Sequence, residues 1–336
     1  MPEIHADRLI AIGEQLDRIM TCDLRARPYI LPMYKAALDH RGRPLSLAAG
    51  QLLSHAIRSK KKPVVVIVTG FASVSLGVGE QDGPVGAVYL GRTLAALGAL
   101  PVFVTDEHQF DLMRQAIRGG GLNVISLDMA RKAIELRPSV STLVGWPADP
   151  DVARRRTQEL LQDLEPVAMV AIERPGANEL GACHQLSGLA LDLSLCSDTD
   201  VLWAAARAAK IPCIGIGDAG NELGMGVIRP LVEHWLGDRK STANGGSIAA
   251  VQEADVTILS AVSNWGAYAT AAAVACVENR PEILPSEETV KLSLIACSLA
   301  GARNGFNDYI DPGADGYPIH IEAAVVTMMT TLSRSI

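Results

Sequence analysis

Aromatic and basic residues are scarce in this chain, and their scarcity excludes some partners. Aromatic residues make up 4% of the 336 residues, and the formal net charge is -7. Proteins that bind nucleic acid usually carry a basic surface with aromatic side chains among the positive charges. The basic clusters at residues 60–62 and 154–156 contain no aromatic residue and are interpreted as solvated faces. We therefore expect no nucleic-acid partner.

Paired cysteines and long hydrophobic runs are also absent from the sequence. The six cysteines are scattered and form no C-x-x-C motif, so neither a zinc knuckle nor a disulfide framework is indicated. Glu3, Asp7 and Glu14 interrupt the N-terminal apolar residues, unlike a secretion signal. Every stretch of membrane-spanning length contains a charge or a glycine-rich break. These absences predict a cytoplasmic protein with reduced thiols and no membrane partner.

Hydrophobic residues make up 49% of the chain and recur as short runs between helical segments. Residues 64–69 are rich in β-branched side chains throughout, as expected of a parallel strand that is covered on both faces. Further strands are expected at residues 101–105, 123–127, 167–172, 213–216 and 256–262, and helices at 85–97, 109–118, 151–163 and 199–209. This alternation predicts an α/β fold with a doubly wound, mostly parallel sheet in a Rossmann-like three-layer arrangement.

Helical additions are expected at both ends of this sheet. Apolar residues recur at helical spacing over residues 9–19, another helix is predicted over 45–59, and the tail from residue 267 is mainly helical. Residues 25–44 contain prolines and are interpreted as a connecting segment. Residues 135–150 and 176–198 are interpreted as two long loops of the kind that form lids or substrate walls. We expect an N-terminal helical segment, residues 1–62, packed on an α/β catalytic domain, residues 63–336, in one compact domain overall.

A glycine-rich turn follows the predicted strand at residues 213–216. It reads Gly-Asp-Ala-Gly-Asn-Glu at residues 217–222, so Asp218, Asn221 and Glu222 lie at the carboxyl end of that strand. Open α/β sheets bind their ligands at this edge. The acidic groups would repel a phosphate unless a cation lay between, which favours a divalent metal with oxygen ligands.

Acids follow other predicted strands as well. Because parallel strands point their carboxyl ends to one edge, we expect these acids to converge. Crowded carboxylates have raised pKa values, and binding of Mg²⁺ or Mn²⁺ relieves their repulsion. The acids concerned are Glu80, Asp82, Asp106, Glu173, Asp218 and Glu222.

Each of these acids also has a simpler structural interpretation. Asp82 precedes a Gly-Pro pair at the start of a predicted helix and can serve as its N-cap. Asp218 and Glu222 can be a cap and a first-turn acid that the helix dipole favours. Asp106 can start the helix that follows it, and Glu173 can form an ion pair with its neighbour in sequence. For these residues the sequence leaves capping and ligation open.

Six short segments near predicted strand ends form an ordered pattern. They read VIVTGF at residues 66–71, DGPVGA at 82–87, VTDE at 104–107, AIERPG at 171–176, GIGDAGNELGMG at 215–226 and VSNWGAY at 262–268. In this order they resemble the blocks of the D-glutamate cyclase family, in its C-terminal domain, and the similarity extends from about residue 45 to residues 315–318. The resemblance implies a metal-dependent hydro-lyase that converts D-glutamate, or a related amino acid, to 5-oxo-D-proline with loss of water.

The implied reaction assigns a hypothetical role to each residue. An amine must attack a carboxylate whose negative charge repels it, so a bound metal would act as Lewis acid while a nearby acid protonates the departing oxygen. The predicted metal ligands are Asp82, Asp218 and Glu222, with Glu173 as a fourth candidate that also stands among the catalytic acids. The predicted bases for the amine are Glu80 or Asp106. The predicted substrate contacts are Arg174, on the α-carboxylate, and Asn221, Asn264 and Gly83.

Two other functions stay open at this point. Ring closure and ring hydrolysis share a transition state, so a metal-dependent hydrolase acting on a lactam, hydantoin or phosphate ester is the second hypothesis. The third is a non-catalytic metabolite-binding protein, which has little need of two acids and a carboxamide in one glycine turn. Each function takes a small molecule. The alanine-rich helix expected at residues 267–277 can pack on the sheet or against another subunit of a homo-oligomer.

Overall fold

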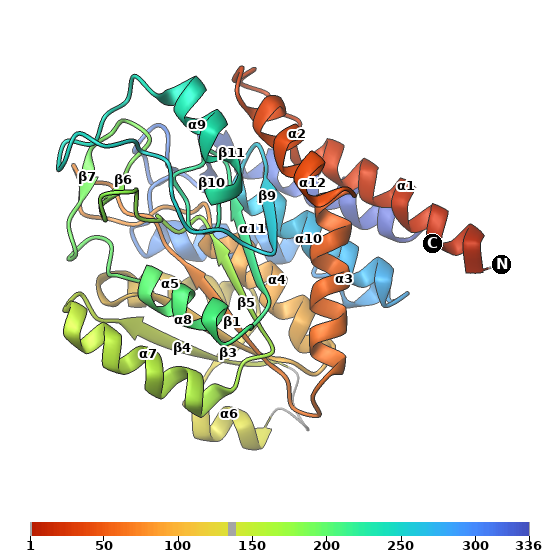
Figure 1. Ribbon diagram of the computed structural model, residues 1–336. Coiled ribbons are helices and arrows are strands. Elements are labelled where there is room, and N and C mark those ends of the chain that lie inside the picture. Colours follow the sequence, from red (N-terminus) through yellow and green to blue (C-terminus); the bar gives the residue numbers. More distant parts are fainter. Residues whose placement is uncertain (1, 134–138, 336) are drawn as a thin grey trace.

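The computed structural model describes residues 2–133 and 139–335, and within them a seven-stranded sheet forms the centre of the fold (Figure 1). The strands run parallel to their neighbours in the order β3-β4-β2-β1-β5-β8-β9. Their bounds are β1 (Val64–Thr69), β2 (Leu100–Asp106), β3 (Asn123–Val124), β4 (Val140–Trp146), β5 (Ala168–Ile172), β8 (Cys213–Gly217) and β9 (Val256–Leu259). The predicted α/β, doubly wound parallel sheet is confirmed.

Helices cover both faces of the sheet because successive side chains of a strand point to opposite sides. In β1, Val65 and Ile67 enter one apolar core, whereas Val64, Val66 and Val68 enter another. The first core also contains residues of α1 (Pro2–Met20), α2 (Ile30–Arg41), α3 (Leu45–Arg58), α4 (Pro84–Ala96), α5 (Phe110–Gly119), α9 (Arg229–Leu236), α10 (Ser263–Val277), α11 (Glu287–Leu299) and α12 (Ile319–Ser333). The second contains residues of α6 (Leu127–Ala133), α7 (Pro150–Leu164) and α8 (Asp200–Ala208). The result is the expected three-layer arrangement.

Several short elements connect the helices and strands. They are the 3-10 turns η1 (Glu107–Gln109), η2 (Gly226–Ile228) and η3 (Pro281–Ile283), and two antiparallel pairs, β6 (Cys183–His184) with β7 (Ala190–Leu191) and β10 (Gly313–Ala314) with β11 (Tyr317–Pro318). The β6–β7 pair lies in the insertion predicted at residues 176–198.

The alanine-rich helix α10 is buried along nearly its whole length inside this chain. It packs between the sheet and α3, where a Cβ on Gly50 would lie only 2.8 Å from the backbone of Ala273. Small residues on both helices permit this close approach. Of the two packing partners considered for this helix, the chain's own sheet is therefore the one observed, and a homo-oligomer stays a prediction.

Two stretches interpreted as irregular contain regular elements. Residues 25–44 include the helix α2, which begins at Ile30, after Pro28, and contains Pro32 in its first turn. A proline is tolerated there because an N–H group in the first turn has no partner within the helix. Residues 139–150 include β4, which pairs with β2 on one side and β3 on the other. Residues 135–138 of the same predicted loop lie outside the described residues. Both interpretations were wrong because isolated prolines and serines do not prevent the apolar residues beside them from forming a helix or a strand.

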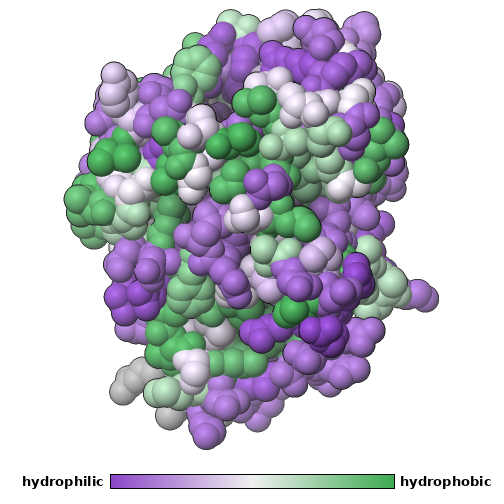
Figure 2. Space-filling model, turned by 90° about the vertical axis from the view of Figure 1, so that its left-hand side faces the viewer, coloured by the Kyte–Doolittle hydropathy of each residue, from purple (hydrophilic) through white to green (hydrophobic). Residues whose placement is uncertain are grey.

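Hydrophobic and hydrophilic residues are interspersed over the face shown in Figure 2, without a continuous apolar band. Among the described residues, none of the helices combines the length and the apolar character needed to cross a bilayer. The N-terminal helices α1 and α3 pack directly on α10, so the division at residue 62 stays a prediction about folding units.

Candidate active site

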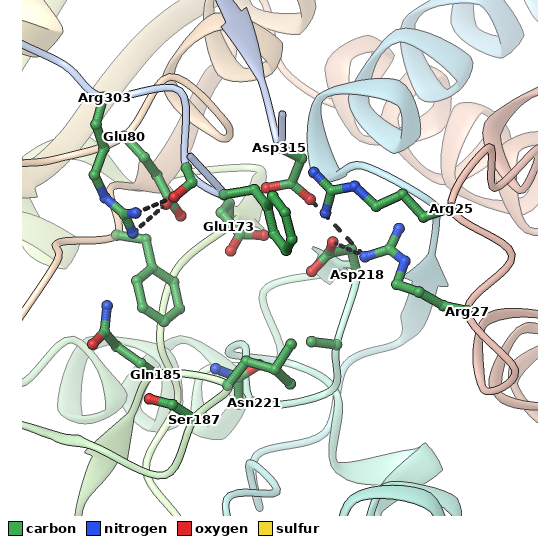
Figure 3. Close-up of a pocket in the computed structure, with 15 residues that line it drawn as sticks. Arg25, Arg27, Glu80, Glu173, Gln185, Ser187, Asp218, Asn221, Arg303 and Asp315 are labelled. Atoms are coloured by element: carbon green, nitrogen blue, oxygen red, sulfur yellow. Dashed lines mark hydrogen bonds and ion pairs between the residues drawn. The ribbon is translucent and has the colours of Figure 1, made fainter. Parts of the chain in front are cut away.

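A pocket lies at the carboxyl ends of three neighbouring strands, where the strand order reverses (Figure 3). From β1 the chain continues to β2 on one side, whereas β5 and β8 lie on the other side of β1. Loops that diverge in this way leave the crevice in which open α/β sheets bind ligands. Phe71 after β1, Glu173 after β5 and Asp218 after β8 line the pocket, whose volume is about 270 Å³.

Segments far from these strands complete the pocket walls. Arg25 and Arg27 come from the connection between α1 and α2, and Arg303 and Asp315 come from the connection between α11 and α12. The insertion before α8 contributes residues 185–187, in agreement with a substrate wall. The sequence analysis missed these four charged residues as site residues because none follows a predicted strand. The only signal was the inclusion of residues 315–318 in the family resemblance.

Asp218 is held by an arginine from the N-terminal segment. Arg27 Nη1 lies 2.9 Å from Asp218 Oδ2 and 4.0 Å from Asp315 Oδ2. Arg27 also donates to the carbonyl oxygen of Ala261. Burial lowers the pKa of the Arg27 guanidinium, but the Asp218 carboxylate outweighs it together with other acids, and the net change is upward. Arg27 therefore stays charged and fixes Asp218 at the pocket wall.

Glu80 forms the second ion pair of the pocket. Arg303 Nη2 lies 2.9 Å from Glu80 Oε2, and both side chains are buried. Burial raises the pKa of Glu80 to about 7, although Arg303 opposes the change. A carboxyl group with this pKa can accept and return a proton near neutral pH.

Glu173 lies at the centre of the acidic cluster and adopts an unusual backbone conformation. Its φ is +44°, in the left-handed region that residues other than glycine rarely adopt. Ser263 Oγ donates to Glu173 Oε2 at 2.5 Å. Burial raises the pKa of Glu173 well above its usual range, and Asp218 and Glu222 raise it further. Gly83 is required beside it, since a Cβ there would lie 2.7 Å from the Glu173 Cβ.

Asp82 and Glu222 accept hydrogen bonds from backbone amides. Asp82 accepts from the amides of Gly83, Ser263 and Asn264 at 2.7–3.0 Å, so it caps the N-terminus of α10 rather than that of α4. Glu222 accepts from the three amides of residues 218–220 at 2.6–3.1 Å. Backbone amides thus account for the position of both carboxylates, although no helix begins at residues 218–222 for Glu222 to cap, and neither residue belongs to the described residues that line the pocket.

Two overlapping groups of acids nevertheless have the spacing of a metal site. Asp82, Asp218 and Asp315 form one group and Glu173, Asp218 and Glu222 the other, and within each group one oxygen per residue lies within 4.8 Å of the others. Burial raises the pKa values of Asp82 and Asp315 well above their usual range, and Asp218 is the next largest cause for both. Burial likewise raises the pKa of Glu222 to about 7. Arg27 contacts Asp218 and Asp315, but the acids of the two groups outnumber it, and such an excess of hard oxygen donors fits a divalent cation.

Arg174 and Asp106, which the sequence assigned to substrate and to base catalysis, bind each other instead. Arg174 donates to both Asp106 oxygens, at 2.5 and 2.9 Å, and both side chains are buried. The remaining donors of Arg174 reach Thr199 Oγ1 and the carbonyl oxygens of Gly70 and Ser197. All five N–H donors of the guanidinium are therefore engaged. Neither residue belongs to the described residues that line the pocket.

The two predicted asparagines occupy different positions. Asn264 is fully buried, and its Oδ1 accepts from the amides of Gly83 and Gly86 at 3.0 and 2.6 Å, so it fixes the turn before α4. Asn221 lines the pocket, and its Nδ2 donates to the carbonyl oxygen of His184 at 2.8 Å. The structure thus brings Glu80, Glu173, Asp218 and Asn221 to the pocket and leaves Asp82, Gly83, Glu222 and Asn264 directly behind it.

Comparison with known proteins finds one family to which this chain is similar. Residues 30–330 match the family profile described as "D-glutamate cyclase-like, C-terminal". The chain is also similar to human D-glutamate cyclase, mitochondrial, with 28% identity over 243 residues. That alignment covers 70% of this chain and 36% of the human protein, so the chain corresponds to about a third of that relative's length.

Proposed function

The chain belongs to the D-glutamate cyclase-like, C-terminal family, and on this basis we propose that it is a hydro-lyase that closes D-glutamate to 5-oxo-D-proline. The observation that carries the proposal is the pocket at the switch point of the sheet, with Glu80, Glu173, Asp218 and Asp315 in its wall. A pocket of about 270 Å³ with this polarity suits a small, charged ligand. We place the activity in the cytoplasm, as the sequence predicts.

We assign a divalent cation, Mg²⁺ or Mn²⁺, to Asp82, Asp218 and Asp315. Two of these acids line the pocket, whereas Glu222 of the alternative group is tied into its own turn. Asp82 Oδ2 accepts a single amide hydrogen bond, from Ser263, and so keeps a lone pair for a cation. When bound, the cation would offset the negative charge of the substrate γ-carboxyl group that opposes attack by the amine.

We assign the proton transfers to the two glutamates in the pocket. Glu80, whose pKa is about 7, accepts the proton of the substrate ammonium group as its nitrogen becomes the nucleophile. Glu173, whose pKa is raised further by the acids around it, keeps its proton at neutral pH and donates it to the departing oxygen. The hydroxyl group so formed takes the proton held by Glu80 and leaves as water, while the nitrogen, now bonded to carbon, releases its second proton to restore Glu173. The reverse sequence opens the lactam, so both directions share these residues.

Turnover with defined substrates tests the proposal. We expect the purified protein with Mn²⁺ or Mg²⁺ to interconvert D-glutamate and 5-oxo-D-proline, resolved by chiral chromatography, and to lose this activity after exhaustive chelation. Asp218→Asn should lower kcat/KM by about 100-fold or more because it removes a charge from the centre of the site. Asp39→Asn, at an exposed position on α2, is the matched control and should keep full activity.

Two outcomes would contradict different parts of the proposal. Absence of turnover in either direction, with both enantiomers of glutamate and of 5-oxoproline, would overturn the lyase assignment. Full turnover after metal removal would overturn the assignment of the cation while leaving the reaction intact.

A further inference from the structure

Among the described residues, three guanidinium groups line the pocket, and two of them pair with acids. Arg27 pairs with Asp218 and Arg303 pairs with Glu80, each at 2.9 Å. The Arg25 guanidinium, by contrast, has no carboxylate oxygen within 4.0 Å of its nitrogens in residues 2–133 and 139–335. A cation next to an acidic pocket but without an acid of its own is free to pair with an anion that enters.

Aromatic side chains hold the Arg25 guanidinium in place. Its central carbon lies 4.2 Å from the centre of the Phe306 ring and 5.0 Å from that of the Tyr317 ring. Gly316 lies against it, since a Cβ there would lie 2.6 Å from Nη2. Stacking occupies the faces of a guanidinium and leaves its N–H donors in the plane for hydrogen bonds. Arg25 is therefore positioned without an ion pair.

Asn221 presents the complementary group on another side of the pocket (Figure 3). Its Nδ2 is bound to the carbonyl oxygen of His184, so the orientation of the amide is fixed. Its Oδ1 is buried and has no hydrogen-bond partner in the described part of the chain. A buried acceptor without a partner costs free energy unless a ligand donates to it.

We infer that Arg25 binds the substrate carboxylate that does not react and that Asn221 accepts a hydrogen bond from the substrate nitrogen. The inference rests on the proposed function. It names the ligand class as a small α-amino acid, or the lactam formed from it, with a free carboxylate on the carbon that bears the nitrogen. Arg25 takes the role that the sequence assigned to Arg174, whose donors are all engaged within the protein.

Binding of two ligands that differ only in the carboxylate tests the inference. With Mn²⁺ present, we expect calorimetry to show that the wild-type protein prefers 5-oxo-D-proline to 5-oxo-D-prolinamide by about 100-fold, the usual weight of a charge-assisted pair. In Arg25→Met this preference should fall to within about threefold, because only the carboxylate loses its partner. Turnover of D-glutamate should show a raised KM with a smaller change in kcat.

Two further variants keep the experiment interpretable. Arg41→Met removes an exposed arginine at the end of α2 and should leave the preference unchanged. Arg25→Lys keeps the charge but not the planar group, and it should retain part of the preference; this variant replaces Arg25→Met if the latter does not fold.

The outcomes separate the inference from the function on which it rests. An Arg25→Met protein that keeps the wild-type preference overturns the inference and leaves the lyase assignment untouched. A wild-type protein that binds 5-oxo-D-proline without interconverting it with D-glutamate overturns the lyase assignment, and the Arg25 comparison still decides the subsite. A wild-type protein that binds neither ligand overturns both.

Discussion

At the scale of the residue, Arg174 and Asp106 show that the hydrogen-bond partners of a side chain determine what it can do. Both are fully or almost fully buried, and their two short hydrogen bonds link the ends of β5 and β2. Removing one member of such a buried pair leaves the other charge without a partner. We therefore predict that the pair stabilises the ends of β2 and β5 rather than contacting the ligand.

Replacement of Arg174 should thus affect stability first. We predict that Arg174→Met lowers the free energy of unfolding by about 3–5 kcal/mol, measured by urea denaturation, because Asp106 is left as a buried, unpaired charge. The double variant Arg174→Met with Asp106→Leu should recover part of this loss. If Arg174→Met instead kept the wild-type stability and raised KM alone, the original assignment to the substrate would be restored.

The sequence was informative about which acids gather and uninformative about what each one binds. Asp218 and Glu173 follow buried strands, and the parallel topology brings them together as expected. The hydrogen bonds from backbone amides that occupy Asp82 and Glu222 depend on the conformation of turns and on the start of α10. Those partners lie up to 182 residues away along the chain, beyond the reach of any local pattern.

At the scale of the element, a buried glutamate joins α12 to α10. Trp265 Nε1 donates to Glu322 Oε1 at 2.6 Å, and Tyr268 Oη donates to Oε2 at 2.9 Å. Burial raises the pKa of Glu322 to about 7, although both hydrogen bonds oppose the change. The folded protein therefore keeps a proton that the unfolded chain releases near pH 4.3.

This difference gives a pH dependence of stability with a definite sign. Where the folded state binds more protons than the unfolded state, stability falls as pH rises. We predict that the contribution of Glu322 is lost between about pH 4.5 and 7 and amounts to about 3 kcal/mol in total. Urea denaturation at pH 5, 6, 7 and 8 should show the wild type losing stability relative to Glu322→Gln over this interval.

An exposed glutamate supplies the control for this experiment. Glu288→Gln on α11 changes a solvated side chain and should give a curve parallel to the wild type. A Glu322→Gln curve that also runs parallel to the wild type would contradict the prediction.

The long, strongly patterned elements were predictable, and the short or interrupted ones were not. The strand β1 is apolar on both faces, and α1 and α3 each present a clear apolar stripe, so their periods identify them. In contrast, β4 contains Ser141 and Thr142 and becomes a strand because β2 and β3 lie on both sides of it. Backbone hydrogen bonds to these two neighbours, rather than a strand-like composition, make this segment a strand.

At the scale of the whole molecule, a bound cation would connect distant parts of the chain. The proposed ligands lie before α4, after β8 and between α11 and α12. Because a cation that binds only the folded state shifts the unfolding equilibrium, we predict a rise of about 5 °C in the thermal midpoint at about 100 times the dissociation constant of Mn²⁺. Differential scanning calorimetry measures this shift.

Substitution of the C-terminal ligand tests the same prediction. Asp315→Asn should abolish most of the Mn²⁺-dependent rise, whereas Asp311→Asn, exposed in the same connection, should keep it. Equal rises in both variants would show that the cation binds elsewhere.

The participation of both chain ends was the part of the site that sequence reasoning could not supply. Arg25 and Arg27 precede the sheet, and Arg303 and Asp315 follow it, so the sheet topology places none of them. Their positions follow from the packing of α1 and α12 on α10 and of α2 against β9 and α3. Packing of this kind is a tertiary property that no periodic pattern encodes.

The late position of the α11–α12 connection also has a consequence for biosynthesis. A ribosome that has translated the chain through Leu259 has produced all seven strands of the sheet, but not yet Arg303 or Asp315. A nascent chain can therefore complete its scaffold while its pocket still lacks one wall. Protection of nascent chains against protease by added ligand should begin only when residues 303–315 have emerged from the exit tunnel.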